Sequence, residues 1–367
     1  MRHTLAALAL TLAATPAFAH GPNDPAHQMF PLGDLKLESG EAIRDFSISY
    51  VTHGKLNEKK SNAVLMVTAL GGNHHRIDYL IGPGKALDPA KYFIICTDAI
   101  SNGLTTSPSN SKAQPRMQFP RFNMRDMVNS THRLVTEKFG ITKLVAVAGA
   151  SMGGMQGLQW AVSYPAMMDS VVAIIPLGRT PAWSAGVTEM LRQTIMTDPE
   201  WKGGNYDSQP ERAMRLWGGW LSGTIVRTPQ FHEASFPNSA DVVPYLKAMQ
   251  ESQWKRIDAN DWIYQSWAYD RHDLGTSKGF DGDTVKALEA IKAKTLILVG
   301  TKDLLNPDFE PRDAASHIQG AKLVTISPGT TTGHASAGGF FPADVEFINR
   351  EAGTFLDAVT EGGKRLN

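Results

Sequence analysis

Short apolar runs recur along the chain and alternate with longer amphipathic stretches. Strands are predicted at residues 43–51, 63–67, around Ile94, and at 144–148, 170–175, 295–300 and 322–327. Helices are predicted between several of them, notably at 124–139 and 152–163. Strands that are apolar along their whole length are typical of a sheet covered by helices on both faces. The alternation predicts an α/β fold with a mostly parallel, doubly wound sheet.

The sequence Gly149-Ala150-Ser151-Met152-Gly153 joins the strand at 144–148 to the helix that follows it. In that context G-x-S-x-G is typical of a nucleophile elbow, a tight turn that lifts a serine hydroxyl above the sheet. Glycines on either side of the serine relieve the crowding of such a turn. An ordinary glycine turn is the alternative interpretation, but the flanking strand and helix favour Ser151 as a nucleophile.

An acid and a histidine should follow such a serine in that order. Asp303 comes just after the strand at 295–300, and His334 ends the glycine- and threonine-rich loop after the strand at 322–327. His334 would take the proton from Ser151, and Asp303 would hold the imidazole in the right tautomer. The competing residues lie in less suitable places relative to the strands: His232, His272, His317, Asp281, Asp283 and Asp308.

An acyl-transfer serine also needs hydrogen-bond donors for the oxyanion. We predict the backbone N–H groups of Met152, directly after the nucleophile, and of Leu70, in the loop at 68–75. His74, His75 and Asp78 lie in or beside this loop and suggest zinc as an alternative. Because no other cluster in the chain completes a ligand set, we predict no metal and no cofactor.

The strand and helix pattern stops between Pro176 and Lys294. An insertion there, directly after the strand ending at Ile175, predicts a cap over the active site at 178–293, between core segments 20–177 and 294–367. We interpret most of its tryptophans as the cap's own core or a dimer contact, with an acyl pocket as the alternative. Seven of the eight tryptophans lie in this stretch: Trp183, Trp201, Trp217, Trp220, Trp254, Trp262 and Trp267.

The N-terminus has the pattern of a secretory signal peptide. Leu5 to Ala14 form an apolar segment too short to span a bilayer, and Ala17-Phe18-Ala19 is a typical cleavage site. We predict that residues 1–19 are removed after Ala19 and that the protein is periplasmic or secreted.

Lysine plus arginine and aspartate plus glutamate number 36 each, so no nucleic-acid or membrane-surface partner is expected. Cys96, the only cysteine, lies in an apolar strand and excludes an intramolecular disulfide.

Five segments resemble the homoserine O-acetyltransferase family of α/β-hydrolases: residues 68–71, 125–128, 149–156, 198–206 and 256–260. The segments at 198–206 and 256–260 are the specific ones, because generic esterases lack them. The resemblance covers nearly the whole mature chain. It implies an eight-stranded α/β-hydrolase sheet, a helical cap, and a homodimer formed through that cap. It also implies Ser151, Asp303 and His334 as the triad, with Leu70 and Met152 as the oxyanion donors.

The chain departs from this family at the positions that bind an amino-acid substrate. Ala335 follows the predicted catalytic histidine, where the family has an aspartate suited to the substrate's amino group. The family's arginine and tyrosine for the substrate carboxylate have no clear counterparts at 213–226, where Met214 or Arg215 would align with the arginine. A closed pocket without counter-charges rejects a doubly charged substrate. We therefore predict a serine hydrolase for small or medium uncharged carboxylic esters.

Two alternatives to ester hydrolysis remain open. The first is an O-acyltransferase, such as an acetyl-CoA-dependent homoserine O-acetyltransferase. The second is a noncatalytic binding protein on the same fold, which an intact triad disfavours.

Overall fold

The computed structural model describes residues 25–326 and 332–361. The predicted signal peptide, 1–19, lies outside the described residues. Among the helices that the structure does describe, none combines the length and apolarity needed to cross a bilayer.

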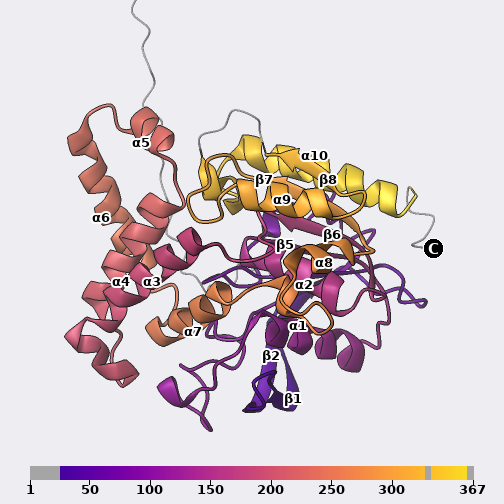
Figure 1. Ribbon diagram of the computed structural model, residues 1–367, viewed down its shortest axis with the longest axis horizontal. Helices are drawn as coiled ribbons and strands as arrows, with labels where there is room; N and C mark the ends of the chain where they lie inside the picture. The colour runs from indigo at the N-terminus through magenta and orange to yellow at the C-terminus, as the bar shows by residue number, and fades with distance from the viewer. Residues whose placement is uncertain (1–24, 327–331, 362–367) are drawn as a thin grey trace, which may run out of the picture.

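One eight-stranded sheet forms the centre of the molecule, as predicted (Figure 1). Its strands occur in the order β1-β2-β4-β3-β5-β6-β7-β8. From β4 to β8 all neighbours are parallel, and β2 is antiparallel to both β1 and β4. The strands are β1 (Gln28–Lys36), β2 (Ala42–His53), β3 (Ala63–Val67), β4 (Phe93–Thr97), β5 (Leu144–Ala150), β6 (Met168–Ile174), β7 (Lys294–Val299) and β8 (Lys322–Thr325).

Strand β1 is the one that the sequence pattern did not reveal. Most of its side chains are exposed, and Leu32 and Leu35 are its buried apolar positions. The pairing with β2 shifts register on both sides of Gly33, whose φ is 66°. Such bulges break the strict two-residue alternation by which a half-buried strand is recognised.

Helices cover both faces of the sheet, because successive side chains of a strand point to opposite sides. On β3, Leu65 and Val67 join the same apolar cluster as α1 (Met124–Arg133) and α2 (Met152–Ser163). Val64 and Met66 join the cluster on the other face, with α10 (Pro342–Val359). The structure thus has the doubly wound arrangement expected of continuously apolar strands.

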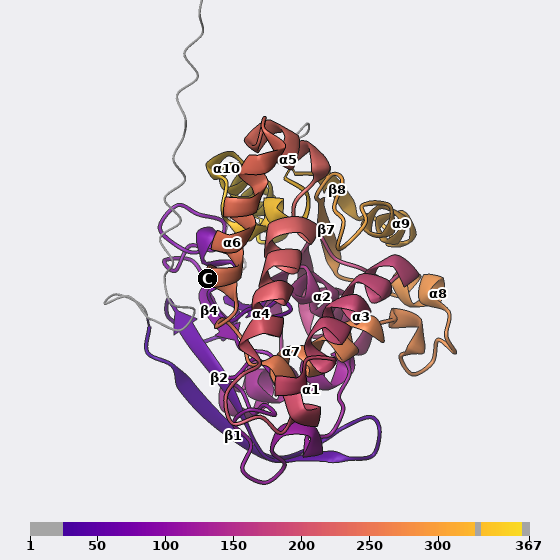
Figure 2. The same cartoon turned by 90° about the vertical axis from the view of Figure 1, so that its left-hand side faces the viewer.

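All the elements described between β6 and β7 are helices or helical turns. Most of these helices stand beside the sheet as a separate layer (Figures 1 and 2). Trp201, Trp217 and Trp262 are buried in the layer's own apolar cluster, whereas Trp183 and Trp220 are each 56% exposed. The helices are α3 (Ala182–Met196), α4 (Glu211–Gly218), α5 (Pro229–Ser235), α6 (Val242–Gln253), α7 (Ala259–Asp270) and α8 (Thr284–Glu289). We call this layer the cap. Helix α7 also buries Tyr264 and Tyr269 in the core cluster, and so ties the cap to the sheet.

Candidate active site

Ser151 occupies the sharp turn between β5 and α2, as the sequence predicted. Its φ is 56°, a conformation that costs a side-chain-bearing residue of the order of 1–3 kcal/mol and is concentrated at functional sites. The Ser151 N–H donates to the Ile174 carbonyl on β6 at 2.8 Å, which holds the turn against the neighbouring strand. The side chain is almost fully buried, yet it lines a pocket.

The glycines of the G-x-S-x-G sequence are required by close backbone contacts. A Cβ on Gly149 would lie 2.4 Å from the carbonyl carbon of Gly153, and a Cβ on Gly153 would lie 2.5 Å from the Val67 carbonyl oxygen. Both distances are far shorter than real carbon contacts. Any larger residue would push α2 away from β3 and β5, and the serine would move with it.

Asp303 and His334 are brought together, although they come from different loops. Asp303 Oδ1 accepts hydrogen bonds from the N–H groups of Leu305 and Asn306, both at 2.8 Å. Its Oδ2 lies 2.8 Å from His334 Nδ1. Because Nδ1 is engaged by the carboxylate, Nε2 is the ring nitrogen left to exchange a proton with a group in the pocket.

Ser151 and His334 line one pocket of about 260 Å³. His334 lies in the 3-10 helix Gly333–Gly338, which the Ala335 N–H anchors to the Val226 carbonyl of the cap at 2.9 Å. The three side chains predicted as nucleophile, base and acid therefore lie together at one site beneath the cap.

The oxyanion donors predicted at Leu70 and Met152 are also beside Ser151. Met152 is the first residue of α2, where backbone N–H groups have no intrahelical acceptor. In the loop after β3, the Gly71 N–H donates to Gln265 Oε1 at 2.9 Å and the Gly72 N–H to the Ala69 carbonyl at 3.0 Å. Within the described residues, Leu70 N–H takes part in no hydrogen bond, so it remains available to a substrate oxygen.

Two glutamines hold that loop in place. Gln156 on α2 donates to the Thr68 carbonyl at 2.9 Å. Gln265 on α7 accepts from Gly71 and donates to the Ile100 carbonyl at 3.0 Å, so it ties the loop to the cap. Both side chains are buried, where an unsatisfied partner is expensive. The position of Leu70 is thus set from below by the elbow helix and from above by the cap.

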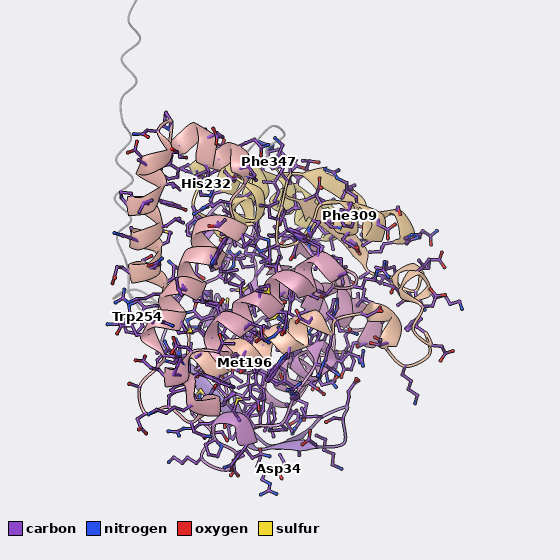
Figure 3. The ribbon with its side chains drawn as sticks, turned by 60° about the vertical axis from the view of Figure 1, so that its left-hand side comes forward. Asp34, Met196, His232, Trp254, Phe309 and Phe347 are labelled. Carbon is purple, nitrogen blue, oxygen red and sulfur yellow. The ribbon has the colours of Figure 1, made fainter. Side chains whose placement is uncertain are left out.

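The competing histidines lie away from Ser151. His272 is buried with Nε2 at 3.1 Å from the Leu177 carbonyl, and burial lowers its pKa to about 4. His317 lies near Asp313 on α9 (Phe309–His317). His232 is in α5 at the far end of the cap (Figure 3). None of the three lines the pocket that contains Ser151.

The residues considered for zinc are divided between two pairs. His75 Nδ1 lies 2.5 Å from Asp78 Oδ2, and His74 Nδ1 lies 3.0 Å from Asp98 Oδ2. In the part of the chain that the structure describes, one group offers three ligand atoms within 4.8 Å: His27, His74 and Asp98. The Asp98 carboxylate already accepts from Ser49 Oγ, Asn102 Nδ2 and the His74 N–H. This pattern is typical of a structural hydrogen-bond network that supports the loop before Arg76.

The remaining wall of the pocket could not be identified from the sequence. It contains Arg76, Gln253, Arg256 and Phe340, beside Ala335, which is buried next to His334. Among the residues that the structure describes, no aspartate or glutamate belongs to this lining. Arg76 follows the oxyanion loop directly, which was an available signal. Arg256 comes from the cap, and nothing in a linear sequence indicates which cap residues turn toward the serine.

The chain matches the family model described as alpha/beta hydrolase fold over residues 62–334. Homoserine O-acetyltransferase of Leptospira biflexa is 33% identical, over 93% of this chain and 98% of the relative.

Two solved structures are similar over 90% of this chain. An acetylester hydrolase from Corynebacterium glutamicum has a TM-score of 0.83 at 28% identity and is covered over 96% of its length. A homoserine O-acetyltransferase from Bacillus anthracis has a TM-score of 0.79 at 28% identity and is covered over 97%. The chain is thus an enzyme of the α/β-hydrolase superfamily. With a relative this similar over nearly its whole length, it belongs to the homoserine O-acetyltransferase family.

Proposed function

We propose that the protein transfers acyl groups through an acyl-enzyme on Ser151. Ser151 Oγ attacks the carbonyl carbon of an ester while His334 Nε2 takes the hydroxyl proton. The tetrahedral oxyanion is held by the N–H groups of Leu70 and Met152. When it collapses, the ester C–O bond breaks and the alcohol leaves with the proton from His334. The observation that carries this proposal is the 2.8 Å contact between Asp303 and His334 in the pocket that Ser151 lines.

For the second half of the reaction, we propose water as the acceptor. His334 would take a proton from water, the hydroxide would attack the acyl carbonyl, and Ser151 would be released with the proton returned to its oxygen. The lining of the pocket supports this choice, because its described residues include no carboxylate to pair with the ammonium group of homoserine. An ammonium group that loses water there without gaining a partner carries a desolvation cost. The pocket of about 260 Å³ is also smaller than the roughly 300–1,000 Å³ of sites for drug-sized ligands, which favours a small ester.

Transfer of the acyl group to an alcohol is the second candidate. The names of the sequence relatives support it better than they support hydrolysis, because the Leptospira biflexa protein and others are homoserine O-acetyltransferases. The solved structures carry both kinds of name. Both candidates share the acyl-enzyme and differ only in the acceptor.

The experiment is a comparison of two substrate pairs with one preparation of enzyme. Steady-state rates are measured for 4-nitrophenyl acetate in water, and for acetyl-CoA with homoserine. We expect ester hydrolysis without saturable acetylation of homoserine. Acetylation of homoserine that is faster than hydrolysis of any ester would replace our first candidate by the second.

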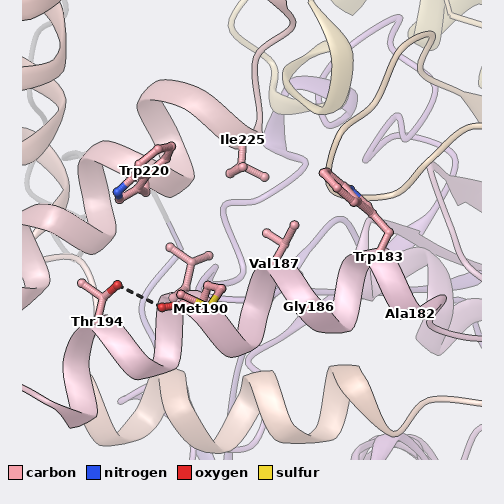
Figure 4. Close-up of a pocket in the computed structure, with 9 residues that line it drawn as sticks. Ala182, Trp183, Gly186, Val187, Met190, Thr194, Trp220 and Ile225 are labelled. Carbon is pink, nitrogen blue, oxygen red and sulfur yellow. Dashed lines mark hydrogen bonds between the residues drawn. The ribbon is translucent and has the colours of Figure 1, made fainter.

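We also propose that two copies associate through the cap. An apolar groove between α3 and the π-helical turn Gly219–Ile225 supports this, with Val187 and Ile225 facing each other across it (Figure 4). Met190 and Trp220, beside them, are 67% and 56% exposed. Such a contiguous apolar surface is typical of an interface. Met190→Glu should convert a dimer into a monomer in sedimentation velocity; a wild-type protein that sediments as a monomer contradicts the proposal.

A further inference from the structure

The described residues that line the active-site pocket provide two guanidinium groups and no carboxylate. Arg76 and Arg256 both belong to its lining, from the loop after β3 and from the segment after α6. Among the described residues, neither of them forms an ion pair. Arg76 is half-buried and Arg256 is exposed, so a substrate can reach both guanidinium groups from the pocket.

Among the described residues, the Arg76 side chain makes one hydrogen bond. Its Nη1 donates to the Ala337 carbonyl at 2.8 Å, in the 3-10 helix that carries His334. Tyr79 Oη donates to the same carbonyl at 3.2 Å. A guanidinium has five N–H donors, so most of those on Arg76 remain for a ligand. Burial lowers the pKa of Arg76, which is the expected sign of a cation that lacks a compensating anion.

Arg256 approaches the same space from the cap. Its Nη1 donates to Gln253 Oε1 at 2.8 Å, and Gln253 also lines the pocket. The Arg256 side chain reaches solvent, but the protein packed around it still lowers its pKa, and the positive charge of Arg76 lowers it further. The two cations are therefore close enough to repel each other. An anion bound between them would remove that repulsion and satisfy their free donors.

We propose that Arg76 and Arg256 bind a carboxylate of the substrate, so that the preferred ester carries a negative charge near its ester group. This inference rests on the proposed acyl transfer at Ser151. It replaces the uncharged ester expected from the sequence by an anionic one. Planar guanidinium groups match a carboxylate through paired hydrogen bonds. Since the described part of the lining has no carboxylate, the same site disfavours a zwitterionic amino acid. Arg76 and Arg256 act as specificity residues and take no part in proton transfer.

The carboxylate can lie on either side of the ester bond, and matched substrates distinguish the two cases. For the acyl side, monoethyl glutarate is compared with ethyl 4-carbamoylbutanoate, which replaces the carboxylate by a neutral amide of the same shape. For the alcohol side, acetoxyacetate is compared with acetoxyacetamide. We expect kcat/KM to be at least about 10-fold higher for the acid in one pair, since a charged hydrogen-bonded contact contributes that much.

The variants separate charge recognition from structural support. Arg256→Gln should lower kcat/KM of the preferred acid by about 10-fold or more, through KM, and lower that of its amide by much less. Arg256→Lys should keep part of the preference. Arg212→Gln removes the same charge from an exposed cap position that faces Asp198. It should leave kcat/KM unchanged for both the acid and its amide. Equal losses for acid and amide in Arg256→Gln, or no preference in the wild-type protein, would overturn the inference.

A binding experiment distinguishes a failed subsite from a failed function. In the Ser151→Ala protein, which cannot form an acyl-enzyme, calorimetry measures the affinity for glutarate. We expect binding that weakens at least about 10-fold when Arg256→Gln is added. Glutarate that does not bind contradicts the arginine subsite. Glutarate that binds while the wild-type enzyme cleaves none of the four esters leaves the subsite intact and contradicts ester hydrolysis.

Discussion

The substitution Gly153→Ala tests whether the elbow is as tightly packed as the structure indicates. The added Cβ would lie 2.5 Å from the Val67 carbonyl oxygen and 3.3 Å from the Thr68 carbonyl oxygen. Both obstacles are backbone atoms of the sheet and of the oxyanion loop, so no side chain can rotate away. Helix α2 must therefore shift, and it carries Ser151 and Met152 with it.

The expected change in the free energy of unfolding is opposite in sign to that of a glycine-to-alanine substitution in an ordinary helix. Replacing glycine by alanine inside a helix normally stabilises it by up to ~1 kcal/mol. Inserting a methyl group into a fully packed space costs about 1–3 kcal/mol, and a backbone obstacle places Gly153 at the upper end. The net effect should be a loss of about 2 kcal/mol in the free energy of unfolding. Turnover should fall by about 10²-fold, because a misplacement of about 1 Å has that effect on a nucleophile.

Urea unfolding and ester hydrolysis are measured on Gly153→Ala beside the control Gly353→Ala. Gly353 lies within α10, and a Cβ there would make only ordinary contacts with Ala86, at 3.7 and 4.0 Å. The control should be as stable as the wild-type protein or more stable, and fully active. A Gly153→Ala protein with unchanged stability and turnover would refute the packing argument.

Three further predictions concern the triad, the acceptor and the pH dependence of stability. Asp303→Asn should keep the fold, measured by circular dichroism, but lower kcat on the order of 10⁴-fold, because an amide misorients the imidazole; a loss below tenfold contradicts its role. Ala335→Asp should depress hydrolysis of neutral esters without creating efficient homoserine acetylation, because it places an unpaired carboxylate beside His334; faster hydrolysis contradicts this. His272 has a folded pKa of about 4, below its unfolded value, so between about pH 6.5 and 4 the unfolded state binds the extra proton and stability falls with falling pH. The loss at pH 5 should be about 2 kcal/mol, and it should be absent in His272→Gln when urea unfolding is compared at pH 7 and pH 5.

The parts of the fold and site that could be predicted are those with local signals. Ser151 was identifiable because its turn needs glycines at fixed offsets, and Asp303 and His334 because each lies in the loop after a predicted strand. The helix predicted at 152–163 has those bounds in the structure. The helix predicted at 124–139 begins as expected, but it passes into a π-helical turn at Leu134–Lys138, for which the hydrophobic pattern carries no signal.

The parts that could not be predicted depend on contacts between distant segments. Gln265 lies 194 residues from Gly71, and only the folded chain shows that it supports the oxyanion loop. Arg256 and Arg76 meet in the pocket although they belong to cap and core. The expectation of an uncharged substrate came from the missing counterparts at 213–226. It took no account of these two arginines, which come from other elements.

Ser151 carries the acyl group in the proposed mechanism, and covalent labelling tests this role most directly. The protein is treated with a fluorophosphonate, and the modified peptide is mapped by mass spectrometry in the wild-type protein and in Ser151→Ala. We predict one label per chain, on Ser151, with a parallel loss of ester hydrolysis, and no label or turnover in the variant. A label on another residue, or ester turnover that survives in Ser151→Ala, would contradict the role of Ser151 as the residue that carries the acyl group.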